Sequence, residues 1–574
     1  MDSVMSDGVG DGQPQSSQQS QAQEPDFEVT PDPISSQFPL SFYGDGLKSG
    51  PKDTQEMEVD GNTHSFAGYT FSDYSLSEPP SKKHQREPVS RTAASLVAAN
   101  ERFMLNEKSF TQQYSGVYFA RLAALRPRVI VEAEKRWGEG FKVGESVHPT
   151  PRHVPRILDI PRGSLCWVVG TVYVEMALKP NILDEVTAEH WIVAPPPLEK
   201  YSSESDKYTL EDEHGRIKLT GSLLKDVMLV TGVVVAVLGA ETKSGDFEVW
   251  DVAYASCAPQ EPHQTFLVPN APNVPDPSER KFVALISGLN MGSDSASHLQ
   301  TELMAEWLAG WCGSVNDQKA VGKIACVIVA GGMIARESPK EGGKDSVGKF
   351  KRTTTSPLAQ SSPHPIQLLD TLLSPLASSS PLVLIPGPHD PTTHSLPQQP
   401  LLRGLLPNLS GWTGTSMATN PFECVVEDVR FLGHAGQPLH DLVFHTPTSS
   451  LLTLATHTLR WQHLAPTAPD TLWCYPFKGG DPFVIGGRRK GKTRAAEGAT
   501  DDTDRGEGGV WCPHVLFSGG GKGTNVETTI YQDASSGARV RVVIVPEFSK
   551  TGVIALVDLA TGDVSSIHFG LGGF

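Results

Sequence analysis

The sequence predicts a β-rich α+β protein, in which a small barrel is followed by a two-sheet α/β/β/α sandwich and a disordered tail precedes both. Two observations predict the folded part. Short β-rich runs separated by turn residues fill positions 164–258, and strands alternate with helices after residue 280. A third observation predicts the tail over residues 1–88, because this stretch is rich in Ser, Gln, Asp, Pro and Gly.

Length and charge limit the function classes. A chain of 574 residues suggests two or three domains. The net charge of -17 argues against a protein whose main task is to grip nucleic acid, so any DNA contact is expected to be local or indirect. The 7 cysteines include no Cys-x-x-Cys pair, which favours a reducing compartment over a disulfide scaffold. No signal sequence or membrane-spanning run is found, and we expect a soluble, intracellular protein with no membrane partner.

Residues 89–275 are expected to form N-terminal helices and a barrel of the OB type. In YSGVYFARLAAL, Tyr118, Leu122 and Leu125 share one helical face, and Pro127 is expected to end or kink the helix. About five short strands over about a hundred residues suit a small OB barrel. The strand runs are SLCWVVGTVYVEM, GRIKLTG, VMLVTGVVVAVLGAE and DFEVWDVAYASCAP.

Residues 276–574 are expected to form the sandwich. The proline-rich stretch PNAPNVPDPSER marks the boundary. Strands KFVALISGL, IACVIVAGG and PLVLIPG alternate with helices ASHLQTELMAEWLAGW and HPIQLLDTLLSPLAS, and Trp307 and Trp311 of the first helix are expected in the core. Two polar, Gly-rich stretches, 336–363 and 486–509, lack periodicity and are interpreted as loop insertions.

Four of the predicted strands end in loops that resemble the metal-binding loops of calcineurin-type phosphoesterases. Such enzymes place Asp, His and Asn side chains at these strand ends, where they bind two cations that activate water. Here the corresponding residues are Gly288 and Asn290 in LISGLNMG, Gly332 in VIVAGGMIA, Pro388, His389 and Asp390 in LIPGPHD, and Gly520 and Lys522 in VLFSGGGK.

These loops lack most of the side chains that the chemistry needs. Glycine offers no ligand, and Lys522 adds a positive charge that opposes cation binding. Asp390 precedes Pro391, which is typical of a turn. We therefore expect a degenerate phosphoesterase site with no catalytic residue, no bound metal and no cofactor.

The longer stretches that are most characteristic are FTQQYSGVYFARLAALRPRV, CWVVGTVYVEMALKPNIL, YTLEDEHGRIKLTG, LIPGPHDPTTHSLPQQPL, TNPFECVVEDVRFLGHAGQPLHDL and WQHLAPTAPDTLWCYPF. With these stretches, the chain resembles the small (B) subunits of eukaryotic DNA polymerase delta over roughly residues 100 to 574. The resemblance implies an OB-fold joined to an inactivated phosphoesterase domain; archaeal relatives are similar but retain the metal ligands and nuclease activity. The two insertions depart from the family pattern.

The resemblance also implies function and partners. It implies a scaffold that binds the cysteine-rich C-terminal domain of the catalytic subunit of polymerase delta and a third, elongated subunit. The catalytic subunit of polymerase zeta is a further implied partner. Contact with DNA would be indirect, and the chain would support DNA replication and repair synthesis in the nucleus.

Two other classes remain open from the residues alone. A phosphoesterase or nuclease with an altered site would use His389 and Asp390, with His463 as a further ligand, although a packing role is favoured for His463. A single-strand DNA binder would stack bases on barrel aromatics, although core or interface positions are favoured for them. These aromatics are Trp167, Tyr173, Phe247, Trp250 and Tyr254. The basic runs 81–86 and 488–494 could serve nuclear import or touch phosphates.

Overall fold

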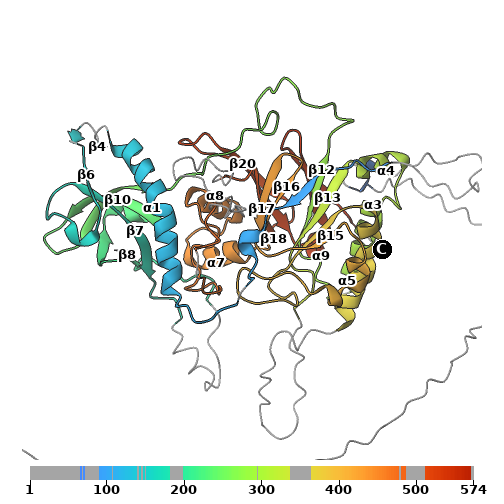
Figure 1. Ribbon diagram of the computed structural model, residues 1–574, viewed down its shortest axis with the longest axis horizontal. Helices are drawn as coiled ribbons and strands as arrows, with labels where there is room; N and C mark the ends of the chain where they lie inside the picture. Colours follow the sequence, from blue (N-terminus) through green and yellow to red (C-terminus); the bar gives the residue numbers. More distant parts are fainter. Residues whose placement is uncertain are drawn as a thin grey trace, which may run out of the picture. The chain divides into compact units, whose positions relative to one another are not determined.

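The computed structural model describes residues 65–66, 69–70, 90–106, 108–138, 141–143, 146–148, 150–180, 198–293, 295–336, 363–477, 480–486 and 511–570 (Figure 1). The tail predicted over 1–88 lies outside these residues, except for a short antiparallel pair formed by β1 (Ser65–Phe66) and β2 (Tyr69–Thr70). The basic runs 81–86 and 488–494 also lie outside them, as do the predicted insertions apart from Arg336, Pro363 and Gly486.

The barrel is a closed ring of five strands, as the sequence predicts. The ring order is β7-β8-β9-β11-β10, closed by antiparallel pairing of β10 with β7. β11 runs parallel to β9, and β6 adds to the outside of β7. The strands are β6 (Arg152–Val154), β7 (Cys166–Glu175), β8 (Lys207–Glu211), β9 (Arg216–Thr220), β10 (Val234–Glu241) and β11 (Phe247–Tyr254). A separate pair joins β4 (Phe141–Val143) and β5 (Ser146–His148).

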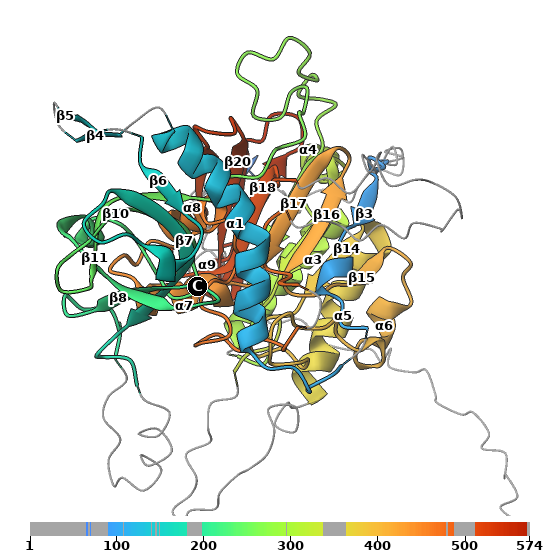
Figure 2. The same ribbon diagram turned by 60° about the vertical axis from the view of Figure 1, so that its left-hand side comes forward.

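One long helix, α1 (Ser115–Trp137), lies across the barrel strands β7, β10 and β11 (Figure 2). The sequence predicts that Pro127 ends or kinks this helix. An end at Pro127 is wrong, because the helix continues for ten residues beyond it. The reason is tertiary: Leu125, Val129 and Ala133 are buried on one continuous apolar stripe. Burial of that stripe outweighs the one backbone hydrogen bond that proline removes.

The first sheet of the sandwich has the order β15-β14-β13-β12-β21-β22. β12, β13, β14 and β15 are parallel, so their carboxyl ends lie at one edge. The strands are β12 (Phe282–Ile286), β13 (Ile324–Ala330), β14 (Leu382–Ile385), β15 (Thr415–Met417), β21 (Val553–Asp558) and β22 (Val564–His568). The helices that accompany it are α3 (Ser295–Ala309), α4 (Val315–Val321), α5 (Pro363–Ser379), α6 (Pro407–Ser410) and α9 (Phe548–Thr551).

The second sheet has the order β19-β20-β18-β17-β16-β3. Its strands are β3 (Leu96–Ala98), β16 (Phe422–Val426), β17 (Val429–His434), β18 (Val515–Gly521), β19 (Glu527–Gln532) and β20 (Arg539–Pro546). The helices α7 (Gln437–His445) and α8 (Leu451–Arg460) belong to its outer layer. β3 precedes the barrel in the chain but pairs with β16, so the sandwich contains strands from both sides of the barrel in the sequence. The predicted domain limits of 89–275 and 276–574 stay a prediction.

Hydrophobic cores explain the layers. Alternate residues of the buried strand β13 face opposite sides: Val327 and Val329 pack against the helices α3 and α5, and Ile328 packs between the two sheets. A third core is shared by the barrel, α8 and the outer face of the second sheet. The barrel and sandwich are therefore joined by continuous apolar packing. In the expected core helix α3, Trp307 is buried, but Trp311, just beyond its end, is exposed.

Candidate functional site

The structure brings the Gly-rich strand ends together at the edge where the parallel strands of the first sheet meet the second sheet. The Gly288 N–H donates to the Gly331 carbonyl at 2.9 Å, and the Asn290 N–H donates to the Gly332 carbonyl at 2.8 Å. From the second sheet, the Gly520 N–H donates to Ser287 Oγ at 2.9 Å. We call this contact the glycine junction and define it as Gly288, Gly331, Gly332, Gly387, Gly519 and Gly520.

The glycine junction is filled by backbone. A Cβ atom placed on Gly387 would lie 2.4 Å from the Gly332 nitrogen, and one on Gly519 would lie 2.2 Å from the Ala330 oxygen. A Cβ atom on Gly332 would lie 3.0 Å from the Gly288 Cα atom. Separations under about 3 Å cannot be accommodated without moving the loops. Any larger side chain, including a metal-binding carboxylate, would therefore need the loops to separate.

Backbone conformation adds to this restriction. Gly288, Gly332 and Gly520 have φ angles of 68°, 66° and 70°, a region that residues with a Cβ atom rarely adopt. Asn290 also lies there with φ of 47°, and its amide Nδ2 donates to Ser549 Oγ at 2.7 Å. These conformations let each loop turn away directly after its strand.

Asp390 holds the loop after β14 in shape. The side chain is buried, its Oδ1 accepts from the Ile334 N–H at 2.8 Å, and its Oδ2 accepts from the Gly387 N–H at 2.7 Å. Burial raises the pKa of Asp390, and the backbone N–H groups only partly offset that rise. Both carboxylate oxygens are thus engaged with the protein's own backbone.

The remaining predicted site residues do not converge. Pro388, His389 and Lys522 are exposed. Burial of part of its ring, together with the Arg336 and His394 charges, lowers the pKa of His389. Among the residues that the structure describes, no three His, Cys, Asp or Glu side chains gather in a geometry able to hold a metal ion.

Sequence reasoning missed the side chains that support the glycine junction. Ser287 Oγ donates to the Ala330 carbonyl at 2.9 Å, and His440 Nε2 donates to the Gly520 carbonyl at 2.8 Å. His434 accepts from the Gly436 N–H through Nδ1, and burial beside His440 lowers its pKa to about 3. Both histidines are visible in the sequence as the ends of the stretch HAGQPLH, but nothing in that stretch indicates what they contact.

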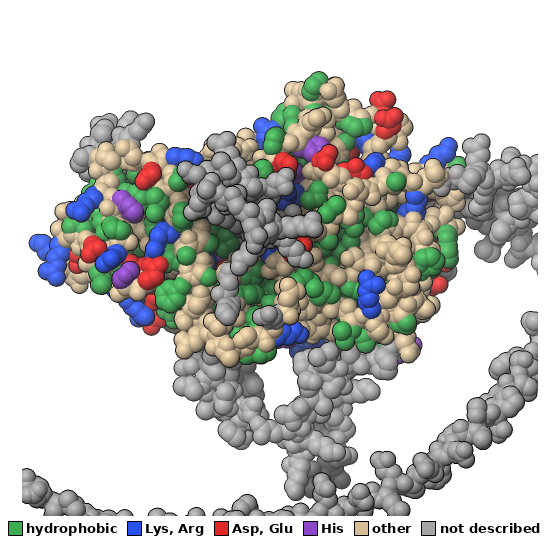
Figure 3. Space-filling view, in the orientation of Figure 1, with side chains coloured by type: hydrophobic (Ala, Val, Ile, Leu, Met, Phe, Trp, Pro, Cys, Tyr) green, Lys and Arg blue, Asp and Glu red, His purple; other side chains and the backbone are tan. Residues whose placement is uncertain are grey.

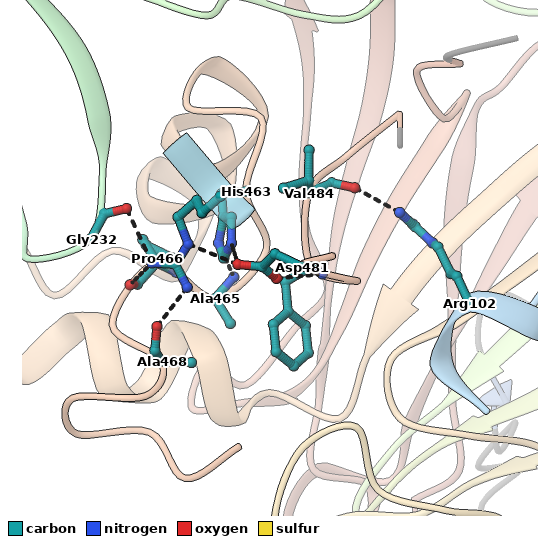
Figure 4. A network of polar contacts seen from close by, with 10 residues as sticks. Arg102, Gly232, His463, Ala465, Pro466, Ala468, Asp481 and Val484 are labelled. Atoms are coloured by element: carbon teal, nitrogen blue, oxygen red, sulfur yellow. Dashed lines mark hydrogen bonds and ion pairs between the residues drawn. The ribbon is translucent and has the colours of Figure 1, made fainter. Parts of the chain in front are cut away.

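A second polar cluster joins the barrel to the sandwich and is fully buried. Arg121 Nε donates to Asp481 Oδ2 at 2.8 Å, and His463 Nε2 donates to the same oxygen at 2.8 Å. Figure 4 shows His463 and Asp481 facing each other, with Gly232 of the turn before β10 to one side. We call Arg121, His463 and Asp481 the interdomain network.

Arg121 satisfies three further carbonyl groups from both parts of the chain. Its guanidinium donates to the Gly232 carbonyl of the barrel at 3.1 Å and to the Pro466 and Ala468 carbonyls of the sandwich at 2.7 Å and 2.6 Å. Figure 4 shows these three carbonyl groups converging. A planar cation with several donors is suited to such a position.

Protonation in this network follows from its hydrogen bonds. The Ala465 N–H donates to His463 Nδ1 at 3.1 Å, so the imidazole is neutral and carries its proton on Nε2. Burial and the Arg121 charge lower the pKa of His463 to about 4. Burial opposes ionisation of Asp481, but His463 and Arg121 outweigh it and hold the pKa of that carboxyl well below its usual range.

The barrel surface offers little that is typical of a DNA-binding face. Of the five aromatic candidates, Trp167, Phe247 and Tyr254 are buried, while Tyr173 and Trp250 are 40% and 37% exposed. Several barrel cations are paired with acids, as in Lys207–Glu175 at 3.6 Å and Arg216–Glu211 at 3.4 Å. Figure 3 shows Lys and Arg interspersed with Asp and Glu at the barrel end.

Comparison with known proteins gives two family matches, one over the barrel and one over the sandwich. Residues 113–252 match the DNA polymerase delta subunit OB-fold domain, and residues 283–488 match the B subunit of DNA polymerases alpha and epsilon. The first range covers α1 and the barrel strands, and the second covers most of the sandwich.

Within the described part of the chain, none of the helices combines the length and the apolar character that a membrane span needs.

Whole-chain relatives agree with these matches. The DNA polymerase delta small subunit of Arabidopsis thaliana is 34% identical over 483 residues, which are 83% of this chain and 96% of that protein. The DNA polymerase delta small subunit of Oryza sativa is 31% identical, covering 84% of this chain and 99% of that protein. DNA polymerase delta subunit 2 of Drosophila melanogaster is 31% identical, covering 81% and 95%. The chain therefore belongs to the family of DNA polymerase delta small subunits.

Proposed function

We propose that this chain is a non-catalytic scaffold subunit of DNA polymerase delta. It binds the cysteine-rich C-terminal domain of the catalytic subunit and a third, elongated subunit, and so supports DNA replication and repair synthesis in the nucleus. The catalytic subunit of polymerase zeta is a second proposed partner. DNA is reached through these partners, and the barrel provides protein contacts.

The glycine junction is the observation that carries this proposal. A two-metal hydrolase needs several ligands at these strand ends, with room for two cations about 3.5–4 Å apart. Here the backbones of Gly288, Gly332 and Gly387 are in direct contact, and both carboxylate oxygens of Asp390 accept from backbone N–H groups. This arrangement supports loss of hydrolysis with retention of the sandwich, since the core does not depend on the former ligands.

The interdomain network supports the scaffold role from a different side. A subunit that presents surfaces of both domains to large partners gains from a fixed relation between those domains. Arg121 connects α1 to carbonyl groups of the barrel and of the sandwich, and Arg128 Nη2 donates to the Gly486 carbonyl at 2.8 Å. These contacts make the two domains one preformed platform.

The test is co-purification of the tagged full-length chain from cells of its own organism. We expect the catalytic subunit to accompany it in equal amounts. The same preparation, assayed with manganese on nucleic-acid and phosphate-ester substrates, should show no hydrolysis above the level of an empty purification. Recovery of the chain alone, or manganese-dependent hydrolysis that is lost in the His389→Ala variant, would contradict the proposal.

A further inference from the structure

Two large aromatic side chains are exposed although the backbone around them is fixed. Phe110 is 74% exposed and Trp473 is 65% exposed. The Leu396 N–H donates to the Trp473 carbonyl at 2.9 Å, and the Tyr475 N–H donates to the Leu396 carbonyl at 2.9 Å. Rigidly held aromatic residues that stay in solvent are typical of binding surfaces, because their ordering cost is already met in the free protein.

Tyr475 connects these two side chains: its ring contacts Phe110, and it lies two residues after Trp473 in the chain. The Phe110 ring packs edge-on against Tyr475, with centroids 5.3 Å apart, and the Tyr475 hydroxyl donates to the Ser109 carbonyl at 2.6 Å. Trp473 and Tyr475 are two residues apart in an extended segment, so their side chains leave on the same side. Trp473 in turn packs edge-on against His394 at 4.9 Å.

A cavity of about 160 Å³ opens beside Trp473. Apolar side chains dominate its wall, and no Asp, Glu, Lys or Arg lines it; the lining residues are Pro388, His394, Leu396, Gln437, Thr471, Leu472 and Trp473. The side chain of Gln437 is fixed by two hydrogen bonds: its amide donates to Gln398 Oε1 at 2.9 Å and accepts from Asn420 Nδ2 at 2.9 Å. The cavity therefore has a rigid floor and suits one uncharged, apolar side chain of a partner.

The charges around the surface favour an acidic partner. Lys108 lies two residues before Phe110, and Arg403 lies four residues after Gln399, whose Oε1 accepts from the Leu105 N–H at 3.0 Å. Both cations are exposed, and neither makes an ion pair with a carboxylate among the described residues. Unpaired cations beside exposed aromatics are complementary to a segment that carries both apolar side chains and carboxylates.

We propose that Phe110 and Trp473 form the docking site for a segment of the polymerase catalytic subunit. That segment places an apolar side chain in the cavity beside Trp473 and a carboxylate near Lys108. The inference rests on the proposed scaffold function and assigns the contact surface that the function needs. The third subunit would bind elsewhere on the chain.

The test uses the full-length chain co-expressed with the catalytic subunit and compares four variants. Phe110→Ala and Trp473→Ala should each weaken binding of the catalytic subunit at least tenfold, since exposed aromatic anchors carry much of the affinity in such interfaces. Lys108→Glu should weaken binding as well, with an effect that shrinks at high salt. Trp311→Ala is the matched control, because Trp311 is 62% exposed but lies in the segment between α3 and α4; it should bind as wild type does.

The outcomes separate this inference from the proposed function. If the wild-type chain fails to bind the catalytic subunit, the scaffold proposal itself is wrong. If wild type binds and the three surface variants bind equally well, the docking site lies elsewhere and the inference is wrong. Loss of the third subunit alone would also contradict it. Should an alanine variant melt at a lower temperature than wild type, Lys108→Glu decides, because its side chain is exposed and supports no core contact.

Discussion

The glycine junction and the interdomain network are both buried meeting points of distant segments, yet they are built in opposite ways. At the glycine junction, side chains are absent and backbones touch. In the interdomain network, the side chains of Arg121, His463 and Asp481 are buried and have hydrogen-bond partners. This chain therefore joins its domains through a buried Arg–Asp ion pair, whereas the buried carboxyl of Asp390 at the strand ends is held by backbone N–H groups.

The free-energy cost of burying a charged side chain explains why both the glycine junction and the interdomain network are stable. Buried carboxylates without cations or hydrogen bonds would be strongly unfavourable, so a site that no longer binds metal is more stable when its ligands are gone. Asp481 escapes this penalty because Arg121, His463 and the Phe483 N–H all donate to it. Asp390 escapes it through two backbone N–H groups.

The largest effect is expected from breaking the interdomain network. Arg121→Met should lower the free energy of unfolding by about 3–5 kcal/mol, because it leaves Asp481 and three carbonyl groups without their cation. Chemical denaturation of the full chain measures this change. Lys207→Ala is the control, since the Lys207–Glu175 pair is more than half exposed on both sides, and it should change stability by less than about 1 kcal/mol. Similar losses in the two variants would mean that the buried network has no special role.

A smaller loss is expected from adding one methyl group to the glycine junction. Gly387→Ala places a Cβ atom 2.4 Å from the Gly332 nitrogen and should cost about 1–3 kcal/mol through overpacking. Gly404→Ala is the matched control, because a Cβ atom there meets nothing within 4 Å. Thermal unfolding of both variants tests this prediction. A Gly387→Ala variant as stable as the control would show that the loops can separate easily, and the claim of a closed site would fail.

The smallest effect concerns pH. The folded pKa of His463 lies near 4, below its unfolded value of about 6.5, so only the unfolded state takes up a proton between these values. Stability must therefore fall as pH decreases from 6.5 toward 4, and His463 accounts for about 1 kcal/mol of that fall between pH 7 and 5.5. Asp481 acts in the same direction at lower pH, because its folded pKa is depressed.

Denaturant titrations at several pH values check this dependence. The His463→Asn variant should show a shallower decline than wild type over pH 7 to 5.5, whatever its stability at neutral pH. Some decline should remain, because burial also lowers the pKa of His434 and His457. An unchanged slope would mean that His463 titrates alike in the folded and unfolded states.

The sequence allowed the layered fold, the barrel and the family to be predicted, because strand periodicity and long characteristic strings are local signals. It also allowed Gly288, Gly332 and Gly520 to be picked out as positions without ligands. The structure adds that Gly288 and Gly332 touch each other and that the Gly520 N–H donates to the neighbouring Ser287, which depends on the approach of loops more than forty residues apart in the chain. No local pattern encodes such an approach.

Other features were missed or misjudged for a similar reason. Arg121 and Asp481 are 360 residues apart, so nothing near either residue indicates the pair. Pro127 is a helix breaker by its own chemistry, but the buried stripe on both sides of it decides the outcome. Trp311 matched a core pattern with Trp307, yet the helix ends at Ala309 and the side chain points to solvent.

The most direct test of a closed, ligand-free site is diffraction at the manganese absorption edge from crystals of the chain soaked in Mn²⁺. We expect no manganese peak beside Gly288, Gly332 and Gly520. A pair of peaks about 3.5–4 Å apart at that position, the separation of cations in two-metal hydrolases, would contradict it.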